Sequence, residues 1–198
     1  MTIKCPWDKD ENGEKVIPSW AADYLLDKDV PATYLKKPSE KTEAQIRSLA
    51  ETVLGQRNFI LLVSQNPSYI WSLYFYLAAT WVTTTHRGFY ILDIKEFDLE
   101  DPKEIVAKLE STSLLIIPYT DPQGWDLRRK RNILGNILAK RKAKNKPVLT
   151  DFFLNKMPKK NSELPQVTQP LANIFGEQSL TLFYARESNA KIIKIKEA

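Results

Sequence analysis

The sequence has almost none of the residues that build disulfide frameworks and zinc centres. Of its 198 residues, one is a cysteine, Cys5, and one is a histidine, His86. A single cysteine cannot form an internal disulfide, and two such residues cannot supply the four ligands of a structural zinc site. We therefore expect no disulfide and no zinc. We also expect Cys5 to be an incidental thiol, since nothing marks His86 as its catalytic partner.

Long apolar runs are missing as well. No run reaches the roughly 20 residues that a membrane-spanning helix needs. The first residues, M-T-I-K-C-P-W-D-K-D-E, lack the apolar stretch of a signal peptide. These absences predict a cytoplasmic protein with no membrane contact. The content of hydrophobic residues, 43%, is enough for one core of ordinary size.

Positive charge is concentrated in one part of the chain. Residues 127–160 contain 12 basic residues and one acidic residue, whereas the whole chain carries a net charge of only +5. The remainder of the chain is therefore net acidic. A concentrated basic segment on an acidic body is typical of proteins that bind phosphate backbones or acidic protein surfaces.

The hydrophobic pattern alternates between strands and helices. It predicts an α/β fold with a mostly parallel sheet flanked by helices, because such alternation requires crossover connections between parallel strands. An amphipathic helix over 40–54, with Ala44 on its core side, precedes the first strand. We divide the chain into an N-terminal segment, 1–39, and a single domain, 40–198. The expected strands cover 58–63, 87–94, 113–117 and 147–152, with a closing hairpin at 180–184 and 191–195; the expected helices cover 68–82, 101–110, 126–145 and a short stretch near 170–175.

Residues 59–72, F-I-L-L-V-S-Q-N-P-S-Y-I-W-S, occupy the place of a phosphate-binding loop, between an apolar strand and a helix. Such a loop reads G-x-x-x-x-G-K-[ST], and its glycines, lysine and hydroxyl hold the phosphates and Mg²⁺. Aligned with it, Ser64 and Tyr69 replace the glycines, Ile70 replaces the lysine and Trp71 replaces the hydroxyl residue. We expect no nucleotide to bind here, and we expect Tyr69 and Trp71 to fill the vacated space. The alternative is an ordinary strand-turn-helix unrelated to such loops.

Several segments in this order resemble the AAA+ domain of DnaC/DnaI-type helicase loaders and their IstB-like relatives. V-P-A-T-Y-L-K-K (30–37) resembles the start of that domain, and residues 59–72 match its Walker A region in position. L-L-I-I-P-Y-T-D (114–121) resembles a Walker B strand, with Pro118 and Tyr119 at the positions of its acids. Residues 127–150 resemble the next helix and strand, after which Phe153 takes the place of a polar sensor residue.

This resemblance implies a P-loop NTPase-like (AAA+/RecA-like) fold without a functional P-loop. It implies a non-catalytic pseudo-ATPase with no cofactor, which acts by binding in DNA replication or mobile-element biology. The implied partners are a replicative helicase, a helicase loader or another replication protein, and DNA through the basic helix. An assembly or regulatory subunit with no DNA contact remains an alternative.

A metal-dependent enzyme is a further alternative. Asp93, Asp121 and Asp151 lie near the ends of three successive predicted strands, where carboxylates could hold Mg²⁺ for nuclease or phosphoacceptor chemistry. Asp is also common in turns and at helix N-termini, so the same residues fit a purely structural role.

The basic segment supplies the candidate binding residues. They crowd the two ends of the predicted helix, and the cations at its start oppose the helix dipole, which would favour acids there. We therefore expect them to contact a polyanion or an acidic protein, although a solvated helix face would carry the same residues. The candidates are Arg128, Arg129, Lys130, Arg131, Lys140, Arg141, Lys142 and Lys144.

Overall fold

A computed structural model describes residues 2–56, 59–92, 102–118, 127–153, 180–185 and 190–194. Its strands form one six-stranded sheet in the order β2-β3-β4-β1-β5-β6. Every pair of neighbouring strands is parallel except β5 and β6, which form the closing antiparallel pair that the sequence predicts. The strands are β1 (Phe59–Ser64), β2 (Phe89–Ile91), β3 (Leu114–Ile117), β4 (Val148–Phe153), β5 (Leu180–Ala185) and β6 (Ala190–Lys194).

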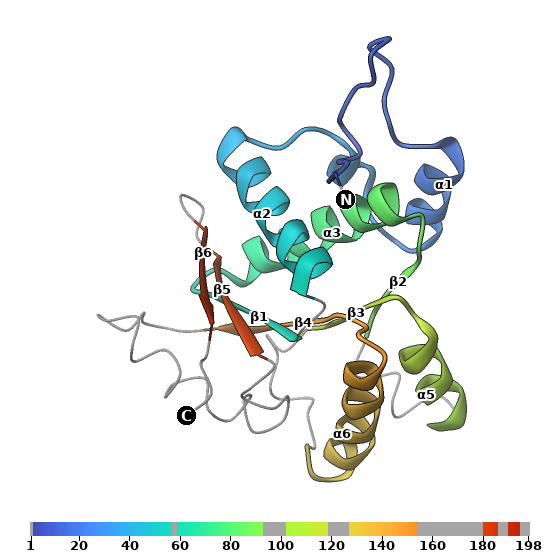
Figure 1. The fold of residues 1–198 in the computed structure, drawn as a ribbon, viewed down its shortest axis with the longest axis vertical. Helices are drawn as coiled ribbons and strands as arrows, with labels where there is room; N and C mark the ends of the chain where they lie inside the picture. Colours follow the sequence, from blue (N-terminus) through green and yellow to red (C-terminus); the bar gives the residue numbers. More distant parts are fainter. Residues whose placement is uncertain are drawn as a thin grey trace.

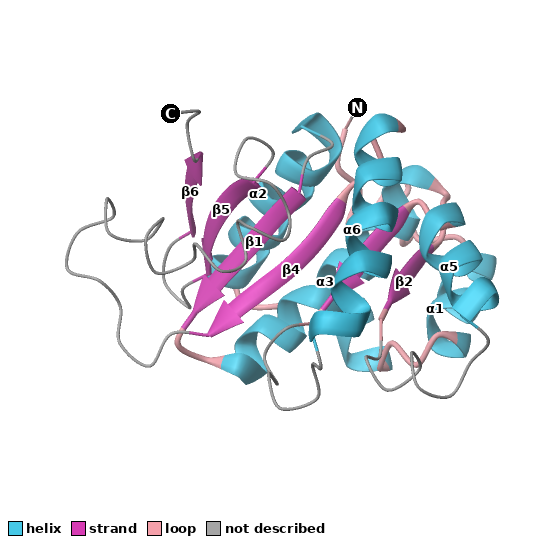
Figure 2. Cartoon of the chain, turned by 90° about the horizontal axis from the view of Figure 1, so that it is seen from below, coloured by secondary structure: helices cyan, strands magenta, loops and turns pink. Residues whose placement is uncertain are grey.

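The helices cover both faces of this sheet. Helices α1, α2 and α3 lie on one face, and α5 and α6 lie on the other (Figure 1). The view from the α5–α6 side shows the strands running next to one another, with β6 at the outer edge (Figure 2). The helices are α1 (Ser19–Asp27), the short 3-10 helix η1 (Ala32–Leu35), α2 (Glu40–Gln56), α3 (Pro67–Thr85), α5 (Pro102–Ser111) and α6 (Leu127–Ala143). The short helix expected near 170–175 lies outside the described residues.

The core lies between the sheet and α3. All six residues of β1 are buried, as expected for a central strand of a parallel sheet. Ile60 and Leu62, on the same face of β1, pack against α2 and α3. Helix α3 is apolar nearly all round, which predicts that it is covered on more than one side. That prediction is confirmed, because the residues before α2 cover the side of α3 that faces away from the sheet (Figure 1).

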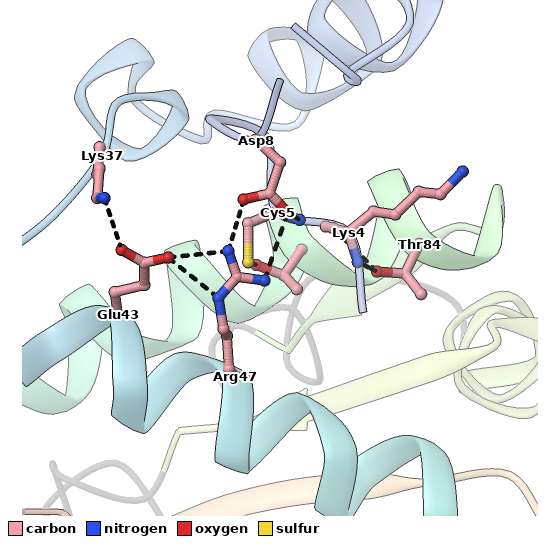
Figure 3. Close-up of polar contacts among 8 residues, drawn as sticks. Lys4, Cys5, Asp8, Lys37, Glu43, Arg47 and Thr84 are labelled. Atoms are coloured by element: carbon pink, nitrogen blue, oxygen red, sulfur yellow. Dashed lines mark hydrogen bonds and ion pairs between the residues drawn. The ribbon is translucent and has the colours of Figure 1, made fainter. Parts of the chain in front are cut away.

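The N-terminal segment, 1–39, is fastened to α2 and α3 by polar contacts (Figure 3). Arg47 of α2 donates through Nη2 to Asp8 Oδ1 at 2.5 Å and to Glu43 Oε1 at 2.8 Å. Lys37 forms an ion pair with the other oxygen of Glu43 at 3.3 Å. The backbone of Lys4 exchanges two hydrogen bonds of 2.9 Å with the hydroxyl of Thr84 on α3. These residues are thus packed on α2 and α3 at several points.

The prediction for one core residue is wrong. Ala44 is exposed, whereas Ile46 is fully buried beside Cys5, Trp7 and Leu73. Ile46 falls on the same helical stripe as Leu49, Ala50 and Val53 at spacings of three and four residues, so α2 turns that stripe inward. No helix in the described part of the chain is long and apolar enough to cross a membrane.

Candidate functional site

The turn between β1 and α3 lies at the carboxyl edge of the sheet, where α/β proteins commonly bind ligands. Strand β1 ends at Ser64 and α3 begins at Pro67, so only Gln65 and Asn66 connect them. Tyr69, Ile70 and Trp71 therefore belong to the first turns of the helix. The connection is thus shorter than a glycine-rich loop that wraps round a phosphate.

The polar groups of this turn are bonded to one another. Asn66 is the N-cap of α3, and its side-chain oxygen accepts the Tyr69 N–H at 3.1 Å. The Ile70 N–H donates to the Asn66 carbonyl at 3.2 Å, and the Asn66 N–H donates to Ser64 Oγ at 3.0 Å. Pro67 has no N–H to offer. The donors that could hold an anion at this helix start are thus mostly in use.

The side chains at the positions aligned with the phosphate-binding residues pack against other side chains. Ile70 is fully buried in the core between α3 and the sheet. Tyr69 packs on the cluster formed by Cys5, Trp7, Ile46 and Leu73; that it fills the vacated space stays a prediction. Trp71 is 37% exposed, and its ring lies 5.8 Å from that of Tyr74 and 5.9 Å from that of Phe75.

Beneath this turn, a tyrosine and a carboxylate are buried together. Tyr74 of α3 donates its hydroxyl hydrogen bond to Asp151 Oδ1 of β4, and both residues are fully buried. Burial, together with the negative charge of Asp151, holds the pKa of Tyr74 well above its ordinary value. Tyr74 therefore remains a protonated donor. Asp151 lies beside Leu62 in the strand register, so this pair occupies the interior behind the end of β1.

The alternative of a metal site gains no support from Asp151. Its buried carboxylate is bonded to Tyr74 on the α3 face of the sheet and does not lie at the solvent-exposed edge that the alternative requires. Asp93 and Asp121 lie outside the described residues. Across the ranges that the structure describes, no group of three or more His, Cys, Asp or Glu side chains is arranged to hold a metal ion.

The basic helix α6 begins and ends close to its predicted limits. Leu134, Ile137 and Leu138 form its buried side. Arg128, Arg129, Lys130 and Arg131 lie in its first two turns, and their side chains are outside the described part of the structure. The cations at the other end divide into two groups, because some of them bind the neighbouring helix α5.

Arg141 is the clearest departure from the sequence-based expectation. It was expected on a binding surface, but it is only 1% exposed. Its guanidinium donates to the carbonyls of Leu109 and Thr112 at 2.7 and 2.9 Å, and to those of Ser113 and Pro147 at 3.2 and 2.8 Å. The physical reason is periodicity: position 141 continues the spacing of Leu134, Ile137 and Leu138, so it faces inward.

Two further cations bind the C-terminal end of α5. Lys146 Nζ donates to the carbonyls of Glu110 and Ser111 at 2.8 and 2.7 Å. Lys140 forms an ion pair of 2.6 Å with the Glu110 carboxylate. Lys146 and Arg141 satisfy carbonyls that a helix end leaves unpaired. All three cations place positive charge at the negative end of the helix dipole.

Lys142 and Lys144 remain as exposed cations at this end of α6. Neither forms an ion pair with another residue in the described ranges. A contact surface built on α6 would therefore use Lys142 and Lys144 together with the cations at its start. The number of charges in the sequence does not distinguish Lys142 and Lys144 from Arg141. The distinction depends on which face of the helix each residue occupies.

Comparison with known proteins adds evidence on the fold. No protein-family model matches the sequence, and no curated protein is significantly similar to it. Among solved structures, the DnaC helicase loader is similar with a TM-score of 0.56 at 11% identity, covering 85% of this chain and 100% of that one. DnaI is similar with a TM-score of 0.51 at 11% identity, covering 80% of this chain and 94% of that one. The predicted P-loop NTPase-like α/β fold, a mostly parallel sheet flanked by helices, is confirmed.

Proposed function

We propose that this chain acts by binding, as a non-catalytic protein of the helicase-loader type that neither binds nor hydrolyses ATP. The β1–α3 turn is the observation that carries the proposal. In a P-loop NTPase-like fold this turn holds the phosphates, yet here it consists of Gln65 and Asn66 alone between strand and helix. The N–H groups of Asn66 and Tyr69 are bonded within the turn, and Ile70 is buried in the position of the phosphate-binding lysine.

The requirements of phosphoryl transfer support the same proposal. Such transfer needs the phosphates, a metal ion and a nucleophile held together by the protein. At the end of β3, Pro118 takes the position of a metal-binding acid. The buried carboxylate of Asp151 is bonded to Tyr74 and faces the core. The described residues around the turn therefore offer no group placed for any of the three tasks.

For the partner, we propose a replicative helicase or another protein of DNA replication. The support is the shared fold with the DnaC helicase loader over 85% of this chain. A direct test mixes the purified chain with the replicative helicase of the same organism and measures complex formation by size-exclusion chromatography with light scattering. A stable complex that forms without added nucleotide is the expected result. Absence of a complex at concentrations of tens of micromolar would contradict this choice of partner.

For the basic surface, we propose contact with a nucleic-acid backbone through the start of α6, with Lys142 at its other end. Binding of this kind weakens steeply with salt, because each neutralised phosphate of duplex DNA contributes a slope of about −0.9 in the logarithm of affinity. It should also be largely independent of base sequence, since contacts to the phosphate backbone carry no sequence information.

The matching variant replaces the four cations at the start of α6, Arg128, Arg129, Lys130 and Arg131, by glutamine. Affinity for DNA should fall and the salt slope should become flatter, while the fold is retained. Its control removes the same number of charges elsewhere, from the exposed residues Lys9, Lys28, Lys36 and Lys41. If the two variants bind DNA equally well, or the parent chain binds none at low salt, an acidic protein surface becomes the explanation for the charge.

A further inference from the structure

A pocket lies at the amino edge of the sheet, opposite the edge that carries the β1–α3 turn. Its volume is about 360 Å³, which falls in the range of sites that receive ligands or anchoring side chains. The ends of α2 and α3 and the starts of β3 and β4 form its walls. Because the β1–α3 turn lies at the opposite edge of the sheet, this amino-edge pocket is separate from the site already described.

The floor of the amino-edge pocket is apolar. Val53 and Leu54 of α2, Trp81 of α3 and Pro147 before β4 line it. The indole of Trp81 is 6% exposed, and its N–H donates to Ser113 Oγ at 3.0 Å. The hydroxyl of Ser113 in turn donates to the Gly88 carbonyl. This floor can therefore pack an apolar side chain.

The rim of the pocket is positive. Arg87, Lys144 and Lys146 line it, and none of the described residues that line it is acidic. Arg87 and Lys144 are exposed and form no ion pair within the described ranges. Burial lowers the pKa of Lys146, and the charges of Arg141 and Lys144 lower it further. Cations that repel one another round an apolar floor favour a negatively charged occupant.

The chemistry of the pocket favours a peptide over a small polar metabolite as its occupant. A metabolite site usually offers several polar groups that converge on the ligand. Here the hydroxyls of Ser113 and Thr85 are already bonded: Thr85 Oγ1 donates to the Trp81 carbonyl at 2.8 Å and accepts the Arg87 N–H at 3.2 Å. Asn145 is the one further uncharged polar side chain among the described residues that line the pocket. An apolar centre with a charged rim is the arrangement of a protein-binding hot spot. Stacking of a nucleic-acid base would need an exposed ring, and Trp81 is buried.

We propose that the amino-edge pocket receives an apolar side chain from an acidic segment of a partner protein, whose carboxylates pair with Arg87 and Lys144. The inference rests on the proposed function in that it names the chemistry of the protein partner. The pocket supplies the anchor site, and the rim supplies steering and orientation.

The test uses the full chain and two fluorescein-labelled probes of matched length, poly-glutamate and a random glutamate–tyrosine copolymer. Fluorescence anisotropy at low salt should show the copolymer binding at least about tenfold more tightly, because an anchored aromatic side chain commonly carries that much affinity. The double variant Arg87→Glu/Lys144→Glu should weaken both probes by about tenfold or more. The control Lys28→Glu/Lys41→Glu makes the same change in net charge at exposed positions elsewhere and should leave both nearly unchanged.

A second variant separates the pocket from its charge. Leu54→Trp places a larger side chain at the pocket wall and should abolish the preference for the copolymer while leaving poly-glutamate binding unchanged. Circular dichroism and thermal unfolding verify that each variant is folded. Equal binding of the two probes by the parent chain, or a preference that survives Leu54→Trp, would overturn the pocket assignment. So would an oligonucleotide that binds more tightly than the copolymer and depends on Arg87 and Lys144.

These outcomes are distinguishable from failure of the proposed function. If the helicase complex forms but the probes do not respond to Leu54→Trp, the pocket inference fails and the function stands. If the probes behave as predicted and no helicase complex forms, the pocket stands and the partner of the chain must be another acidic protein.

Discussion

Replacing Arg141 by methionine should destabilise the protein far more than the same change at Lys142. The two residues are adjacent in α6 and carry the same charge, yet Arg141 is buried and Lys142 is exposed. Methionine retains most of the length of the side chain and removes the donors. The carbonyls of Leu109, Thr112, Ser113 and Pro147 would then lose their partner.

The magnitude follows from these four hydrogen bonds. A hydrogen bond to a charged group contributes about 1.5–3 kcal/mol, so a simple sum would reach roughly 6–12 kcal/mol. Two effects reduce it. Removing the cation also removes the cost of its burial, which lowers the pKa of Arg141 to about 10, and water can reach some of the freed carbonyls. We expect about 3–5 kcal/mol for Arg141→Met, and less than about 0.5 kcal/mol for Lys142→Met.

Urea unfolding followed by circular dichroism measures both free energies. A loss of about 3 kcal/mol should also lower the melting temperature by roughly 6–12 °C in a chain of this size. If Arg141→Met and Lys142→Met differ by less than about 0.5 kcal/mol, which is the usual scatter among surface changes, then Arg141 does not hold α5 to α6 in the way described.

Three further predictions concern the N-terminal segment and the start of α3. Burial raises the pKa of the Cys5 thiol to about 11, so Cys5 should react with a thiol reagent at pH 8 far more slowly in the native protein than in urea; equal rates would contradict its burial. Burial opposes ionisation of Glu43, but hydrogen bonds from Arg47 and Lys37 outweigh it and lower the pKa of Glu43; the resulting stability is present above pH 4.5 and is lost as the pH falls through the lowered pKa. Arg47→Met should therefore cost about 1–2 kcal/mol near pH 7 and less at pH 3, whereas an equal cost at both pH values would refute the ion pairs. Asn66→Ala should cost about 1 kcal/mol through loss of the N-cap, and Asn66→Asp should retain the stability in thermal unfolding; a neutral Asn66→Ala would show that this cap does not hold the β1–α3 turn.

The order of elements could be predicted from local patterns in the sequence. The apolar run of β1 and the flanking polar turn define a central strand followed by a helix, and the structure places both within a few residues of the expected limits. The start of α3 also had a signal, because Asn followed by Pro is the usual N-cap and first position of a helix. The strand order of the sheet has no local signal, since pairing of β1 with β4 joins residues about ninety positions apart.

Contacts between distant elements were beyond the reach of the sequence. The bond between Tyr74 and Asp151 joins a helix to a strand 77 residues away, and nothing near either residue indicates it. Arg141 was foreseeable in part, because it lies on the apolar stripe of α6. The reason that a cation is tolerated there, the carbonyls at the end of α5, depends on how the two helices pack.

Isothermal titration calorimetry of the purified chain with Mg-ATP tests the central claim most directly. The short β1–α3 turn and the buried Ile70 predict no saturable heat up to millimolar nucleotide. The DnaC helicase loader, which shares the fold, provides the comparison protein under the same conditions. A saturable isotherm with a dissociation constant in the micromolar range would contradict the account, because it would mean that this fold binds nucleotide without the residues that a phosphate-binding loop requires.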